Sequence, residues 1–124
     1  MMKKNYTDVA LLVLRVGFGG FMLTHGTPKI GMLSNPSDFG DPIGVGATAS
    51  LILALIGEVV APIMMIIGFK TKLAAIPAAI TMMVAAFVVH AQDDLATKEH
   101  ALLFFISFVV IFLAGPGKYS VDKG

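Results

Sequence analysis

The sequence is dominated by four long apolar segments, at about residues 7–29, 47–69, 71–91 and 97–114. A helix needs about 20 mainly apolar residues to cross the hydrocarbon core of a bilayer. The first three segments reach this length, and the fourth is marginal because Lys98 and Glu99 would have to extend toward the interface. Only 14% of the 124 residues are charged, too few to cover a soluble domain. The sequence therefore predicts one membrane domain over residues 1–124: an all-α bundle of four transmembrane helices in contact with the lipid bilayer.

The connections between the segments differ in charge. Lysines lie before the first segment, between the second and third, and after the fourth: Lys3, Lys4, Lys70, Lys72, Lys118 and Lys123. The other two connections carry the acidic residues Asp38, Asp41, Asp93 and Asp94. Since short basic loops stay in the cytoplasm, we expect both termini inside (N-in/C-in), with 115–124 as a cytoplasmic tail. The outer loop 30–46 is too long for a tight helical hairpin, and we expect it to fold back as a lid or a re-entrant piece.

Composition excludes several classes of function. The formal net charge is +1 and the basic residues lie mostly at segment ends, so no nucleic-acid partner is expected. The chain has no cysteine, which removes disulfides, thiol nucleophiles and iron–sulfur clusters, and we expect no covalently bound cofactor. Three histidines with a carboxylate would suit zinc or iron, but no H-x-x-x-H spacing supports this, so no metal site is predicted. Redox chemistry would need a bound molecule or a partner protein.

Two charged residues, Arg15 and Glu58, fall deep inside apolar segments. With a rise of about 1.5 Å per residue, the expected topology places them at similar depths. An isolated charge in the bilayer costs at least roughly 2.5–3.5 kcal/mol on insertion scales, and pairing offsets most of that cost. We predict a buried ion pair between Arg15 and Glu58. It has two interpretations: a structural pair that sets helix register, or the floor of a ligand site with a proton path.

A second polar group is expected near the outer leaflet, with the members His25, Lys29, His90, Glu99 and His100. At about 100° per residue, Arg15, His25 and Lys29 share one face of the first helix, which we expect to look into the bundle. We predict that the outer group binds a ligand, with the histidines suited to titrate near neutral pH. The alternative is structural: interhelical hydrogen bonds, and side chains that anchor helix ends at the interface.

Four motifs resemble those of the DoxX family: R-x-G-x-G-x-x-x-x-x-H-G-x-x-K at 15–29, Gly57-Glu58, GFKTKLAA at 68–75, and GPGKYSVD at 115–122. They occur in the family's order and cover nearly the whole chain. The resemblance implies a small four-helix, multi-pass protein of the bacterial inner membrane. It also implies similarity to a subunit of an archaeal thiosulfate:quinone oxidoreductase, and to relatives tied to thiol and oxidative-stress complexes.

Two hypotheses for function follow. In the first, the protein is a subunit of a membrane oxidoreductase system that binds a quinone or a similar amphipathic molecule and works with an oxidoreductase partner protein. In the second, it is a non-catalytic interaction or assembly protein: its buried charges are structural, and the loop 30–46 or the tail binds a partner. A channel or transporter would need a homo-oligomer, because no inverted repeat is detectable. The sequence does not decide whether the protein is an enzyme.

Overall fold

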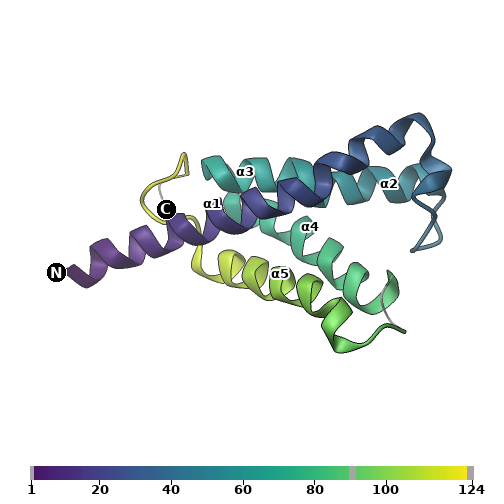
Figure 1. Cartoon of the computed structure of the whole chain (residues 1–124). Coiled ribbons are helices and arrows are strands. Elements are labelled where there is room, and N and C mark those ends of the chain that lie inside the picture. The colour runs from purple at the N-terminus through teal and green to yellow at the C-terminus, as the bar shows by residue number, and fades with distance from the viewer. Residues whose placement is uncertain (1, 90–91, 123–124) are drawn as a thin grey trace.

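The computed structural model describes residues 2–89 and 92–122, and every regular element in this part of the chain is helical (Figure 1). The elements are α1 (Met2–Ile30), η1 (Gly31–Ser34), η2 (Pro36–Asp38), α2 (Ala47–Leu55), η3 (Ile56–Val60), α3 (Ala61–Ile67), α4 (Thr71–Val84), η4 (Ala85–Val89) and α5 (Leu95–Ala114). The short elements η1 and η2 are 3-10 turns, whereas η3 and η4 are π turns inside long helices. The predicted all-α fold is confirmed.

Three helical stretches within the described residues are long and apolar enough to cross a membrane: Tyr6–Ser34, Ala47–Ile67 and Thr71–Val89. The helix α5 is the fourth long segment. The second stretch ends two residues earlier than expected, because Gly68 adopts a left-handed conformation with φ +75°. The N–H of Phe69 then donates to the carbonyl of Met64 at 2.8 Å, which closes the helix end.

The helices pack as two neighbouring pairs, α1 against α3 and α4 against α5 (Figure 1). Small side chains on α4 allow the second contact, since Ala74, Ala75 and Ala78 are buried in one cluster with Phe108 and Ile111 of α5. Small residues let helix backbones approach closely inside a membrane. The alanine-rich character of the third apolar segment is therefore explained by packing.

Two glycines let the π turn η3 lie between α1 and α4. A Cβ atom on Gly26 of α1 would lie 2.7 Å from the carbonyl carbon of Glu58, and one on Gly57 would lie 2.7 Å from the Cβ of Thr81 in α4. Both distances are too short for real side-chain contacts. The π turn ends just before the first turn of α3, where Pro62 has no N–H for a helical bond to Glu58. Glu58 is therefore placed between α1 and α4.

Candidate ligand-binding site

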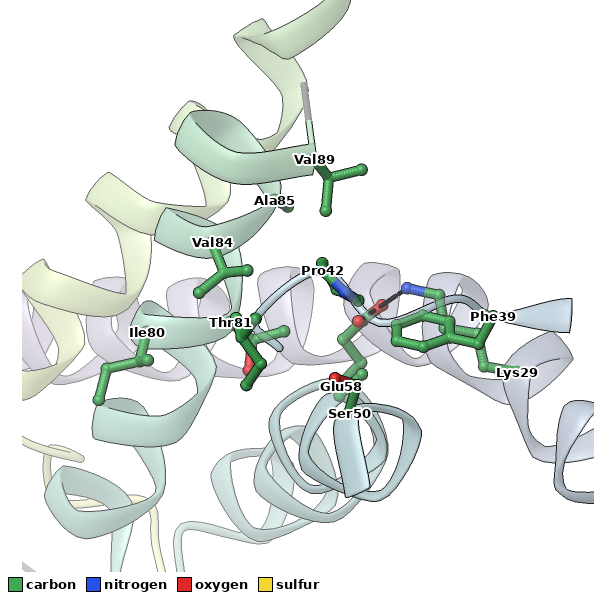
Figure 2. A pocket seen from close by; sticks show the side chains of 12 residues that line it. Lys29, Phe39, Pro42, Ser50, Glu58, Ile80, Thr81, Val84, Ala85 and Val89 are labelled. Atoms are coloured by element: carbon green, nitrogen blue, oxygen red, sulfur yellow. Dashed lines mark hydrogen bonds and ion pairs between the residues drawn. The ribbon is translucent and has the colours of Figure 1, made fainter. Parts of the chain in front are cut away.

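A buried ion pair between Lys29 and Glu58 forms the centre of the site. The Nζ of Lys29 donates to Oε1 of Glu58 at 2.7 Å and to Oε2 at 2.8 Å. The Glu58 side chain is only 4% exposed and that of Lys29 is 28% exposed. Figure 2 shows the two side chains meeting between their helices. A carboxylate that receives both hydrogen bonds from one ammonium is well compensated for its burial.

The predicted pair between Arg15 and Glu58 is wrong, because the guanidinium of Arg15 has other partners. It donates to four backbone carbonyl oxygens: Pro116 at 2.9 Å, Met65 at 2.8 Å, Ile66 at 3.0 Å, and Tyr119. The error lay in the assumed helix depths. Since Gly26 contacts Glu58 and Arg15 lies about three helical turns before Gly26, the antiparallel register places Arg15 opposite the end of α3.

Arg15 instead joins the C-terminal tail to the end of α3. Next to it, the carboxylate of Asp122 accepts the N–H groups of Lys70 and Thr71, each at 2.8 Å. The N–H of Asp122 in turn donates to the carbonyl of Gly68 at 2.9 Å. The backbone N–H of Thr71, the N–H of Lys70 and the charge of Arg15 hold the pKa of Asp122 below its usual value. Three of the four sequence motifs, those at 15–29, 68–75 and 115–122, thus meet at this end of the bundle.

A first cavity of about 170 Å³ lies on one side of the Lys29–Glu58 pair (Figure 2). Its walls are mostly apolar and come mainly from the loop after η2, the helix α2 and the second half of the α4 segment, while α1 and η3 contribute the ion pair. The lining residues are Lys29, Phe39, Pro42, Ile43, Ser50, Ala54, Glu58, Ile80, Thr81, Val84, Ala85 and Val89. An engineered apolar cavity of about 150 Å³ is large enough to bind benzene, so this one can hold a six-membered ring.

The loop 30–46 folds back over this cavity. Phe39 lies beneath the ammonium of Lys29, with 5.6 Å between Nζ and the ring centroid. The carboxylate of Asp41 ties the loop to the start of α2, because it accepts the N–H groups of Val45 at 2.9 Å and Gly46 at 2.7 Å. The Ser50 hydroxyl, which donates to Asp41 at 2.7 Å, and these N–H groups lower the pKa of Asp41.

A second cavity of about 140 Å³ lies on the other side of the ion pair. Lys29, Glu58 and Ala85 line both cavities, so the pair separates them. The further lining residues of the second cavity are Met22, His25, Met82, His100, Ala101 and Phe104. The site is therefore two chambers, one mainly apolar and one containing two imidazoles, divided by a salt bridge.

The two histidines of the second cavity lie against each other. The ring centroids of His25 and His100 are 4.3 Å apart, with 59° between the planes. Phe104 presents its ring nearly perpendicular to both, at centroid distances of 5.7 Å from His25 and 5.2 Å from His100. These ring contacts hold the two imidazoles next to each other between α1 and α5.

The structure thus brings together three members of the predicted outer group, His25, Lys29 and His100. Glu99 is exposed and lines neither cavity, and His90 lies outside the described residues. Sequence reasoning paired Glu58 with Arg15 and did not find the loop residues, such as Phe39, as lining groups. The glycine before Glu58 and the proline four residues after it, Gly57 and Pro62, were the sequence signals that could have indicated its position. Whether the group binds a ligand stays a prediction.

The fold and the site define a multi-pass helical membrane protein in which the Lys29–Glu58 pair lies between two cavities and the exposed imidazoles of His25 and His100 line the second of them. The DoxX family profile matches residues 10–91. The sequence is also 27% identical over 127 residues to the Inner membrane protein YqjF of Escherichia coli (strain K12), an alignment that covers 97% of this chain and 95% of that protein. No solved structure gives a significant match. The chain belongs to the DoxX family, and it is a multi-pass protein of the bacterial inner membrane.

Proposed function

We propose that this DoxX protein binds an amphipathic molecule with a single-ring, quinone-type head group in the first cavity, as the membrane subunit of an oxidoreductase system. The proposal rests on the Lys29–Glu58 pair, which lies at the wall of a mostly apolar cavity of about 170 Å³. Ligand sites usually combine apolar walls with a few well-placed polar groups. The ring would lie among Phe39, Pro42 and Val84, with its polar edge toward Lys29.

The chemistry of the ion pair supports a carbonyl acceptor. An ammonium carries three N–H donors, and Lys29 uses two of them on Glu58, which leaves one for a ligand oxygen. Behind the pair, the second cavity is lined by His25 and His100, and an imidazole can donate a proton from one ring nitrogen and accept one at the other. Protons would pass between the two cavities through Lys29 and Glu58. A bound quinone would supply the redox chemistry, since the chain has no cysteine.

The proposal includes a placement in the membrane, with four spans and both termini in the cytoplasm. The lysines at one end of the bundle and the acidic residues of the loop 30–46 at the other support this orientation. Because the chain has no native cysteine, single substitutions report the side directly. In intact cells a membrane-impermeant maleimide should label Ser37→Cys, while Lys118→Cys should react only after lysis. The reverse pattern would refute the orientation.

The alternative function, a non-catalytic assembly protein, is favoured by one specific observation. Arg15 uses its donors on backbone carbonyls of α3 and the tail, which is a structural role for this buried charge. The clamped tail also leaves Tyr119 44% exposed and Val121 61% exposed. Such apolar side chains beside the clamp would suit a protein partner.

A cavity-filling variant separates the two functions. Ala54 lines the first cavity and is 7% exposed, so Ala54→Leu should fill part of the space that a ring occupies. Ala49 lies on the same helix and is exposed, so Ala49→Leu adds the same bulk outside the cavity. Protein purified in mild detergent would be extracted, and small molecules identified by mass spectrometry. We expect a near-stoichiometric quinone-type molecule in the native protein and in Ala49→Leu, and at least about a tenfold loss in Ala54→Leu.

The thermal unfolding midpoint of each variant shows whether the fold is retained. Recovery of bulk phospholipid alone from the native protein would refute the ring-binding proposal and favour the assembly function. Equal recovery of the ligand from Ala54→Leu and Ala49→Leu would place the ligand elsewhere. Neither result depends on the histidines of the second cavity.

A further inference from the structure

The second cavity gathers four neutral side chains that are ligands for soft metal ions. Two are the imidazoles of His25 and His100, whose ring centroids are 4.3 Å apart. The other two are the thioethers of Met22 and Met82, which are 1% and 6% exposed and line the same cavity. Met22 and His25 are three residues apart on α1 and therefore share a face of that helix. The four groups come from three different helices.

We propose that the second cavity binds one monovalent copper ion, Cu(I), through the imidazoles of His25 and His100 and the thioethers of Met22 and Met82. This site goes beyond the ring-binding function and does not require a molecule in the first cavity. The neighbouring Phe104 packs its ring against both imidazoles and covers one side of the site.

The donor chemistry selects Cu(I) over harder cations. Thioether sulfur is a soft ligand that favours Cu(I), and imidazole is also a good copper ligand. Zinc, iron and manganese sites usually include thiolates, carboxylates or a third imidazole, and in the described part of the chain no three such residues are arranged so that they could hold a metal ion. Glu58 lines the cavity, but both of its carboxylate oxygens accept hydrogen bonds from Lys29.

The charge balance points the same way. The Lys29–Glu58 pair at the cavity wall is neutral as a unit, and thioethers and the metal-binding form of imidazole add no negative charge. A divalent ion would bring two uncompensated charges into an apolar bundle, whereas Cu(I) brings one. Neutral thioethers also need no deprotonation, so binding would not depend on a buried acid being ionised.

The test uses the full-length protein in detergent, titrated anaerobically with Cu(I) against the chromophoric chelator bicinchoninate. Met22→Leu and Met82→Leu remove sulfur while nearly keeping the side-chain volume, so the fold should survive. Met83→Leu is the matched control, because Met83 is the next residue on α4, is 42% exposed and does not line the cavity. We expect one equivalent of Cu(I), at least about tenfold weaker binding in either cavity variant, and no change in Met83→Leu.

X-ray absorption at the copper edge gives an independent readout. The native site should show both nitrogen and sulfur neighbours of the copper. The Met22→Leu/Met82→Leu double variant should show nitrogen neighbours only. Cu(I) should also raise the unfolding midpoint, because it ties three helices together. Absence of stoichiometric Cu(I), or equal binding by Met22→Leu, Met82→Leu and Met83→Leu, would overturn the proposal. Ala54→Leu should retain Cu(I) even if it loses the ring ligand, so the two proposals fail separately.

Discussion

Replacing Arg15 with methionine should be among the most destabilising single changes in the protein. The guanidinium is 1% exposed and donates to four carbonyl oxygens of α3 and the tail. Methionine keeps most of the length but leaves these acceptors without a donor. Removing one partner from a buried charged network costs about 3–5 kcal/mol. Chemical unfolding in detergent should therefore show a loss of at least about 3 kcal/mol in the free energy of unfolding.

The conservative variant Arg15→Lys serves as the control for charge alone. Lysine retains the positive charge but has three donors on a compact head group, and it cannot reproduce the planar fork that reaches both α3 and the tail. We expect it to recover only a small part of the lost stability. An Arg15→Lys protein as stable as the native one would show that the charge, and not the hydrogen-bond geometry, is what matters at this position.

Double-mutant cycles test the corrected pairing directly. Since Lys29 and Glu58 are in contact, the effects of Lys29→Met and Glu58→Gln should be strongly non-additive. The effects of Arg15→Met and Glu58→Gln should instead add, because the two side chains have separate partners. Coupling between Arg15 and Glu58 as large as that between Lys29 and Glu58 would restore the original pairing.

The second large effect is expected from Gly57→Ala. The added Cβ would overlap Thr81 and would lie 2.9 Å from the carbonyl oxygen of Pro77, which belongs to the backbone of α4 and cannot simply rotate away. The helix α4 must move away from η3. Overpacking typically costs about 1–3 kcal/mol, and we expect this change to reach or exceed the upper limit because a backbone is involved. Thermal unfolding of the purified variant measures the loss.

Gly20→Ala is the matched control, because a Cβ there meets nothing within 4 Å. It should leave the unfolding midpoint unchanged or slightly higher, since alanine favours helix over glycine. Combining Gly57→Ala with Thr81→Ala should recover part of the stability, because the Thr81 hydroxyl is one of the overlapping groups. A Gly57→Ala protein as stable as Gly20→Ala would contradict the tight packing of η3 against α4.

The helices were predictable because their signals are local. Apolar runs of sufficient length, the glycine at Gly68 and the stop at Gly115–Pro116 can each be read from a short stretch of sequence. The inward positions of Arg15 and Lys29 on α1 were also predictable from helical periodicity, whereas His25 on the same face is exposed. The structure places Arg15 inside the bundle and Lys29 against Glu58.

The pairing of charges between helices was not predictable in the same way. It depends on how far α1 slides along the second helix, and a slide of about three turns would be needed to bring Arg15 to the level of Glu58. The register is set by contacts such as that between Gly26 and the backbone of Glu58, which no single segment reveals. The loop residues over the first cavity were missed for a similar reason, because Asp41 and Ser50 form their hydrogen bond only once the loop has folded back.

The π turn η3 also bears on how relatives of this chain should be aligned. A π turn carries one residue more than the α-helical turn it replaces, and each residue of an α-helix advances the side-chain direction by about 100°. Deleting one residue between Ile56 and Val60 would restore an unbroken α-helix while rotating Glu58 relative to α3. The carboxylate would then leave the wall between the two cavities. A homologue with a one-residue gap at this point is expected to have lost the partition, even if it retains both the glutamate and the lysine.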